Sequence, residues 1–118
     1  MRTGDIYWVN LDPAIGDEIQ KKRPVVFLNG GHEKHLRLAI VAPITSWNPA
    51  WERNPFFVPL EPTAKNGLKK KSVIDCFQVR AISHRRFLER LGVIALDDIS
   101  RVKKSLALIL DLDPEDCE

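Results

Sequence analysis

Three cationic side chains, those of Lys21, Lys22 and Arg23, directly precede Pro24 and the apolar run VVFLN, and Glu18 lies a few residues earlier. A proline holds the residue before it in an extended conformation, so Arg23 is expected at the mouth of a strand. This group has two interpretations. The charges either protect a strand from aggregation, or they form an edge that binds an anion such as phosphate.

The elements that would position these charges are mostly strands, since β-branched and aromatic runs alternate with turn residues. Predicted strands cover 6–11, 24–29, 36–46, 56–60 and 72–83. Segment 36–46 is apolar on both faces, as in a central strand of a closed sheet, and Pro59 marks an edge strand. Apolar residues at helical spacing predict a closing helix at about 96–110. We therefore predict a mainly β (α+β) fold, a small barrel with helical additions.

Within 72–83, alternation would place Val73, Phe77 and Val79 on one face with Asp75. We interpret Asp75 as a hydrogen-bonded structural acid and not as a catalyst.

The chain length of 118 residues fits a single domain, which we assign to residues 1–110. The formal charge of +2 conceals an asymmetry, because the first 110 residues carry 18 bases and 11 acids, whereas the last eight carry five acids. A basic body suits a polyanionic partner, since cations near phosphates release counterions. We predict that 111–118 is a disordered acidic tail.

The two cysteines, Cys76 and Cys117, form no CxxC pair and no disulfide framework, which indicates a reducing compartment. Neither a secretory signal nor an apolar stretch long enough to span a bilayer is evident. We expect a cytoplasmic protein that does not interact with membranes.

Several ordered motifs resemble those of the MazF/PemK family, the toxin ribonucleases of toxin–antitoxin pairs. The matching residues are Gly4-Asp5, Leu11-Asp12-Pro13, Gly16-Asp17-Glu18, Arg23-Pro24, Pro43-Ile44-Thr45-Ser46, Gln78, Arg80 and Ile82. The resemblance covers nearly the whole of residues 3 to 110. It implies an SH3-like, mostly antiparallel barrel with a C-terminal helix, assembled as a homodimer.

The resemblance also implies an activity. Members of the family cut single-stranded RNA (mRNA) at short sequence motifs, without a metal ion or other cofactor, and leave a 2′,3′-cyclic phosphate and a 5′-hydroxyl. The implied partners are single-stranded RNA and a cognate antitoxin protein, with DNA bound only through the antitoxin complex.

The chemistry of such a cut indicates which residues would act. The attacking 2′-oxygen must lose a proton, and the negative charge that develops on the phosphorane must be stabilised. Arg23 offers paired guanidinium donors, Thr45 offers a hydroxyl, and Glu18 is the available carboxylate for proton transfer. For each of them a plain structural role is the alternative: a strand-guarding cation, a hydroxyl bonded to its own backbone, and an exposed loop acid.

Further residues are predicted to bind RNA along the same surface. They are Ser46, Lys21, Lys22, Trp47, Gln78, Lys70 and Lys71. A run of lysines is often only a solvated surface. An indole near the surface can stack on a base, although a half-buried tryptophan is equally ordinary in a small domain.

The sequence departs from some family members at positions used in catalysis. Those members have Arg and Asp where this chain has Asp75 and Phe77, and His where it has Asp17, so that version of the mechanism is excluded here. The stretch HEKH, with His32 and His35, is similar to a zinc motif, but its histidines are three apart and not four, so we expect no metal.

Two other functions are alternatives to the ribonuclease. The same barrel occurs in CcdB-type gyrase poisons, which act by binding a protein and not by cutting RNA. An inactive barrel that only binds RNA is the second alternative. The gyrase poisons use the end of the C-terminal helix, which in this chain runs into acidic residues, so we favour the ribonuclease.

Overall fold

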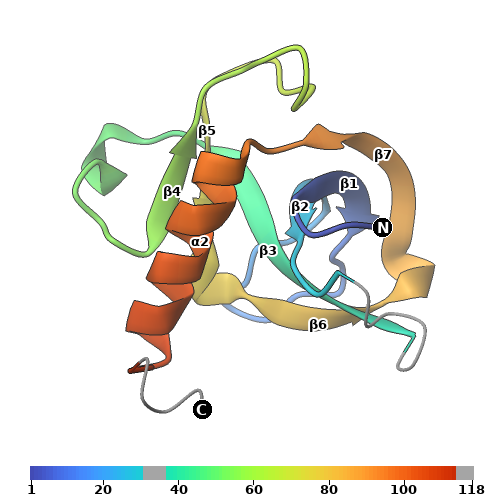
Figure 1. Cartoon of the computed structure of the whole chain (residues 1–118). Helices are drawn as coiled ribbons and strands as arrows, with labels where there is room; N and C mark the ends of the chain where they lie inside the picture. The colour runs from blue at the N-terminus through green and yellow to red at the C-terminus, as the bar shows by residue number, and fades with distance from the viewer. Residues whose placement is uncertain (31–36, 114–118) are drawn as a thin grey trace.

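Residues 1–30 and 37–113, which are those that the computed structural model describes, form seven strands in one curled sheet with one α-helix against it (Figure 1). The strands are β1 (Asp5–Asn10), β2 (Lys22–Phe27), β3 (Leu38–Ser46), β4 (Phe57–Leu60), β5 (Ser72–Asp75), β6 (Arg80–Ser83) and β7 (Phe87–Val93). The helix is α2 (Leu96–Ile109), and the short 3-10 helices are η1 (Pro49–Trp51), η2 (Cys76–Gln78) and η3 (His84–Arg86).

The strands curl into a small antiparallel barrel. Hydrogen bonding orders them β4-β5-β3-β2-β1-β7, and β6 pairs with the first half of β3. The single turn of η3 then leads from β6 into β7, which pairs with β1. The predicted mainly β barrel with a C-terminal helix is therefore confirmed, and β4 lies at the predicted edge.

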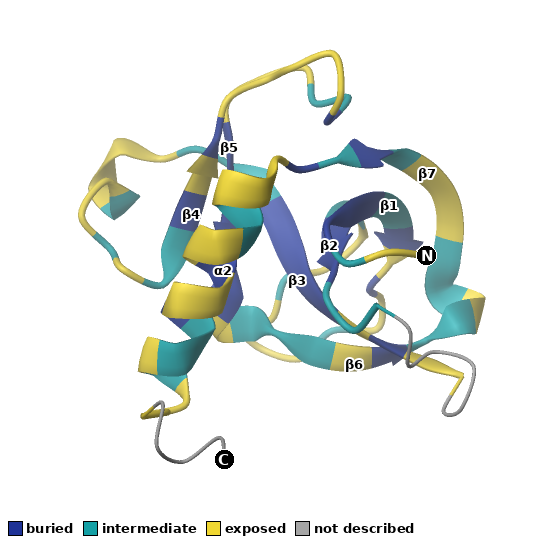
Figure 2. Ribbon diagram, viewed as in Figure 1, coloured by how far each residue is buried: buried dark blue, intermediate teal, exposed yellow. Residues whose placement is uncertain are grey.

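Strand β3 is the central element because both of its faces are buried (Figure 2). Ala42 and Ile44 belong to a core beneath α2, together with Val102 of the helix. Ala39 and Val41 belong to a second core inside the barrel. The prediction of a strand that is apolar on both faces is confirmed, and this burial fixes which residues of β3 can face each side.

Helix α2 covers one face of the sheet with an apolar stripe. Val102 is fully buried, and Ile99 and Leu106 pack against the same core. Ser105 is also buried, and its hydroxyl donates to the carbonyl of Pro55 at 2.9 Å. Asp97 and Asp98 lie in the first turn, where a helix favours negative charge. The outer face of the helix is exposed (Figure 2).

The single strand predicted over 72–83 is wrong, because η2 divides it into β5 and β6. The Asp75 carboxylate accepts the N–H of Phe77 at 3.1 Å and caps this turn. As a result, Phe77 does not follow the predicted alternation, and its side chain is 61% exposed. The structural role predicted for Asp75 is confirmed, and burial raises the pKa of its carboxyl while the N–H bonds from Gln78 and Phe77 oppose that rise.

Two further predictions of element boundaries need correction. Strand β2 begins at Lys22, so Lys22 and Arg23 belong to the sheet and Pro24 is its third residue, opposite Trp8. Strand β7 was not predicted at all. Its register against β1 shifts twice, between Ile6 and Tyr7 and between Trp8 and Val9, so its sequence lacks the regular alternation that reveals a strand.

No helix among the described residues is long and apolar enough to cross a membrane. Within the predicted acidic tail, residues 114–118 lie outside the described part of the chain.

The thiol of Cys76 is fully buried between η2 and α2. Its burial raises its pKa to about 11, although a hydrogen bond with Ser105 opposes this shift. Because the thiolate is the reactive form, Cys76 is expected to be inert in the folded protein at neutral pH.

We predict that a Cys117→Ser variant, in which Cys76 is the sole thiol, does not react with Ellman's reagent at pH 8 while it is folded. In urea the same variant should release one equivalent of chromophore, because unfolding exposes the thiol and returns its pKa to the ordinary range. Rapid stoichiometric reaction without urea would show that the core around η2 is open.

Candidate active site

Arg23 and Thr45 lie on neighbouring antiparallel strands and line the same cleft. The β2–β3 register ends with Val25 opposite Pro43, and Arg23 and Thr45 lie two residues beyond that pair, one on each strand. Residues two apart on a strand project from the same face, so Arg23 and Thr45 share the face of Val25 and Pro43. Both are half-buried, and the Arg23 Nε donates to the carbonyl of Gln20 at 3.3 Å. The sheet therefore brings together two groups that are far apart in the sequence.

Both residues line one cleft of about 650 Å³, which we call the basic cleft. Some of its lining residues carry ammonium, guanidinium or hydroxyl groups, and others are apolar. The lining residues are Trp8, Lys22, Arg23, Pro24, Ile44, Thr45, Ser46, Gly67, Leu68, Lys69, Lys70, Ser72 and Leu91. Four of these are Lys or Arg and none is Asp or Glu, so the field in the cleft favours an anion.

One wall of the basic cleft is the segment between β4 and β5, which Asn66 organises. The buried Asn66 Oδ1 accepts the N–H groups of Thr63 and Leu68, each at 3.0 Å, and its Nδ2 donates to the carbonyl of Glu61 at 2.8 Å. Gly67 follows with φ +70, and a Cβ there would lie 2.5 Å from the carbonyl oxygen of Leu91. This turn delivers Lys69 and Lys70 to the cleft.

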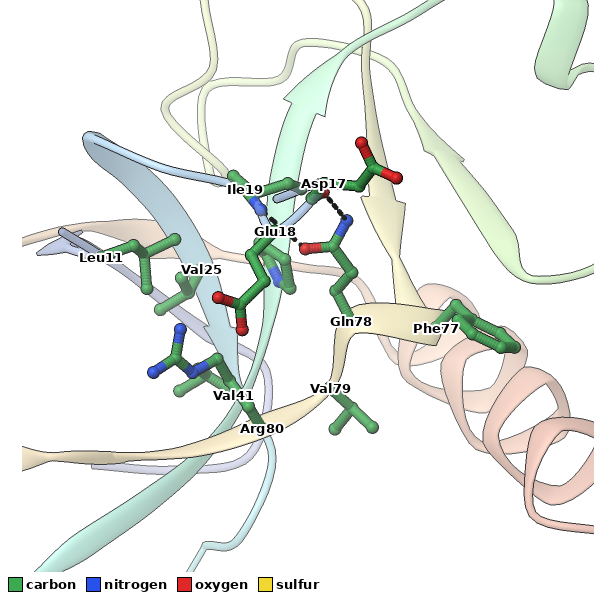
Figure 3. A pocket seen from close by; sticks show the side chains of 11 residues that line it. Leu11, Asp17, Glu18, Ile19, Val25, Val41, Phe77, Gln78, Val79 and Arg80 are labelled. Carbon is green, nitrogen blue, oxygen red and sulfur yellow. Dashed lines mark hydrogen bonds between the residues drawn. The ribbon is translucent and has the colours of Figure 1, made fainter. Parts of the chain in front are cut away.

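A second cleft of about 510 Å³, which we call the loop cleft, lies under the segment between β1 and β2 (Figure 3). Its lining residues are Leu11, Asp17, Glu18, Ile19, Val25, Val41, Pro43, Phe77, Gln78, Val79 and Arg80. The charged groups at its rim are of both signs, so it lacks the uniform positive field of the basic cleft. Val25 and Pro43 line the loop cleft, and Arg23 and Thr45, two residues away on the same two strands, line the basic cleft, so the two clefts are neighbours.

Gln78 holds the segment between β1 and β2 in place. Its Oε1 accepts the N–H of Ile19 at 2.7 Å and its Nε2 donates to the carbonyl of Asp17 at 3.4 Å (Figure 3). Glu18 lies between these two anchored residues, and its Oε1 accepts the N–H of Ile15 at 2.6 Å. The figure shows the Glu18 carboxylate and the Arg80 guanidinium both directed into the cleft.

The structure divides the predicted site residues into three groups. Arg23, Thr45, Ser46, Lys22 and Lys70 line the basic cleft. Glu18 and Gln78 line the loop cleft instead. Lys21, Trp47 and Lys71 line neither: the N–H of Lys21 donates to Asp12 at 2.8 Å, and Lys71 lies over the ring of Trp47.

Other charged residues of these clefts were not among the predicted site residues. Lys69 lines the basic cleft, and the sequence indicated it only as the first of three lysines, 69–71, that either line an RNA groove or form a solvated surface. Arg80 lines the loop cleft, and its signal was its place two residues after Gln78 in a recognised motif.

Among residues 1–30 and 37–113, no three His, Cys, Asp or Glu side chains are grouped to hold a metal ion. His32 and His35 of the HEKH stretch lie outside the described residues. The groups that the basic cleft does offer are a guanidinium, a hydroxyl and ammonium groups, which together suit a phosphodiester.

Comparison with known proteins identifies the family of this chain. Residues 2–110 match the family described as PemK-like, MazF-like toxin of type II toxin–antitoxin system. The chain is 32% identical over 118 residues to Endoribonuclease MazF9 of Mycobacterium tuberculosis, covering 95% of this chain and 98% of the relative.

Solved structures with similar folds include MazF from Deinococcus radiodurans, with a TM-score of 0.81 and 25% identity over 95% of this chain and 97% of that one. A crystal structure of MazE-MazF from the same organism gives a TM-score of 0.74 and 25% identity, over 96% and 97% of the two chains.

We predict that Gln78→Ala loosens the segment between β1 and β2, since it removes both amide contacts to that segment. Limited trypsin digestion should then cut faster after Lys21 and Lys22. Gln78→Glu retains the acceptor for the Ile19 N–H and should fall between Gln78→Ala and wild type. Gln20→Ala is the matched control, because Gln20 contacts Arg23 through its main chain. Equal cleavage rates for Gln78→Ala and wild type would contradict the anchoring role.

Proposed function

This chain belongs to the family of PemK-like, MazF-like toxins of type II toxin–antitoxin systems, and we propose that it is an endoribonuclease whose reaction centre is the Arg23–Thr45 pair. The observation that carries this proposal is that a guanidinium on β2 and a hydroxyl on the neighbouring strand β3 line one cleft, whose lining includes no Asp or Glu. The preferred substrate is single-stranded RNA, because only RNA carries the 2′-hydroxyl that serves as the nucleophile.

The cut follows from the groups present. The ribose 2′-hydroxyl gives up its proton as its oxygen attacks the adjacent phosphorus, and the bond from phosphorus to the 5′-oxygen breaks. The departing 5′-oxygen takes up one proton, so a 2′,3′-cyclic phosphate and a 5′-hydroxyl result with no net change in protons. Arg23 donates to the phosphorane oxygens with its paired N–H groups, and Thr45 donates its hydroxyl to the same phosphate. No step requires a metal ion.

Proton transfer is assigned to Glu18. It lies at the edge of the loop cleft and not in the basic cleft, so it would act from the side of the pair opposite the lysines. The contacts of Gln78 with the residues on either side of Glu18 support this assignment, because they limit where the carboxylate can lie.

The remaining cations and hydroxyls would hold the RNA backbone. Lys22, Lys70 and Ser46 line the basic cleft, which supports a role in contacting phosphates on either side of the cut. Gln78, whose amide is already bonded to the loop, would read a base only indirectly through the position of that loop.

We further propose that the chain acts as a cytoplasmic homodimer and is silenced by a cognate antitoxin, since MazF from Deinococcus radiodurans has been crystallised with MazE. An acidic, disordered antitoxin segment suits the basic cleft, where it would exclude RNA. DNA would be bound only through the antitoxin complex.

The test is RNA cleavage by purified protein in EDTA, with mapping of the new ends. We predict 5′-hydroxyl ends from wild type, and a loss of about 100- to 1,000-fold in rate for Arg23→Ala, because removal of one preorganised donor costs about 3 kcal/mol of barrier. Thr45→Ala should lose a similar factor, whereas Thr45→Ser keeps the hydroxyl and most of the activity.

Arg53→Ala is the control for charge alone, because Arg53 is exposed and lines neither cleft. A folded Arg23→Ala protein with wild-type activity would overturn the assignment. Ends that carry a 5′-phosphate would overturn the proposed chemistry.

A further inference from the structure

Glu61, Lys71 and Trp47 form a row across the ends of three neighbouring strands, beside the basic cleft. In β5, Ser72 pairs with Leu60 of β4 and with Ser46 of β3. One residue further along, Lys71 therefore lies between Glu61, which follows Leu60, and Trp47, which follows Ser46. The N–H of Trp47 donates to the carbonyl of Lys71 at 3.2 Å and continues the ladder. The Lys71 Nζ lies 4.2 Å from the centroid of the Trp47 ring and 3.4 Å from the Glu61 Oε1.

The row adjoins the proposed reaction centre. Ser46 and Ser72, the chain neighbours of Trp47 and Lys71, both line the basic cleft. Trp47 lies two residues beyond Thr45, about 7 Å along an extended chain. That distance corresponds to a single nucleotide step of extended RNA.

Lys71 covers the indole only loosely. The side chains of Lys71 and Glu61 are 42% and 70% exposed, so water screens their ion pair and RNA can displace it. The Trp47 ring is half-buried, but the cation over it belongs to an exposed lysine, so this contact is also weak. A base stacked on the same indole gains more than this contact loses.

We propose that Trp47, Lys71 and Glu61 form a nucleotide subsite next to the cut. In this subsite one RNA base replaces the Lys71 ammonium on the indole, and Lys71 exchanges Glu61 for the phosphate of that nucleotide. Glu61 thus competes with RNA for Lys71 and lowers the affinity of the resting protein. The subsite rests on the proposed ribonuclease function. It adds to that function a position on Trp47 where a base stacks, and a lysine that covers this position while RNA is absent.

A nucleotide fits the row better than an acidic peptide does. Any base has a flat π-face for Trp47, and the nearby Lys69 and Lys70 of the basic cleft continue the line of phosphate partners. A peptide carboxylate would engage Lys71 but would leave the indole without a stacking partner.

The test uses the full-length protein and a mixed-sequence 2′-O-methyl oligoribonucleotide, which binds but cannot be cut because its 2′-oxygen is methylated. Affinity is measured over a series of salt concentrations, and cleavage of unmodified mRNA is measured in parallel. Trp47→Ala should weaken binding about tenfold and leave the salt slope unchanged, whereas Trp47→Phe should retain most of the affinity. Circular dichroism checks that each variant is folded.

The charged members of the row give a different signature. Lys71→Ala should reduce the magnitude of the slope of log K against log salt by about 0.7, the value for one phosphate contact on a single strand. Glu61→Gln should tighten binding by up to about fivefold at low salt, because it releases Lys71. Glu52→Gln, an exposed acid outside both clefts, is the matched control.

The outcomes separate this inference from the function on which it rests. If mRNA is cut and wild-type affinity survives Trp47→Ala and Lys71→Ala, the subsite is overturned and the ribonuclease stands. If an acidic peptide depends on Trp47 for binding and RNA does not, the subsite is likewise overturned. If wild type neither binds nor cuts RNA, both proposals fall.

Discussion

The antiparallel register between β2 and β3 is the constraint on which the rest of the site depends. It sets Val25 opposite Pro43, and Arg23 and Thr45 lie two residues beyond this pair on the same face, although 21 residues of chain separate them. Side chains alternate faces along a strand, so a slip of one residue would turn one of the two away from the other. The two cores prevent such a slip, because Ala42 and Ile44 are buried on one face of β3 and Ala39 and Val41 on the other.

The two segments that flank this pair are fixed by buried or half-buried amides. Asn66 shapes the segment that carries Lys69 and Lys70, and Gln78 anchors the segment that carries Glu18. Each side chain satisfies several main-chain groups at once, which limits the freedom of an otherwise irregular chain. The result is one cleft that contains Arg23 and Thr45 and whose charged lining residues are all cationic, beside a second cleft of mixed charge.

Much of the fold was predictable because its strands are long and apolar or end at clear turns. The double burial of β3, the edge position of β4 and the helical spacing of α2 are all local signals. Strand β7 was not predictable, since its bulged pairing with β1 breaks the alternation. In 72–83 the many strand-forming residues gave no sign of the turn at 76–78, which the Asp75 carboxylate caps by accepting the N–H of Phe77. The motif resemblance indicated Arg23 and Thr45 as site residues, but their proximity depends on how β2 and β3 align. Glu18 lies in the other cleft because Gln78 anchors the segment that carries it, and no local sequence pattern reveals that contact.

The central claim is that the Arg23 guanidinium and the Thr45 hydroxyl act on one phosphate, and a double-mutant cycle of RNA cleavage tests it most directly. The cycle compares single-turnover rates of wild type, Arg23→Ala, Thr45→Ala and the double variant in EDTA. Groups that stabilise the same transition state couple, so the double variant should lose less than the two single losses combined, by about 0.5 to 3 kcal/mol. Losses that add within about 0.5 kcal/mol would show that the two side chains act independently, and would contradict the account.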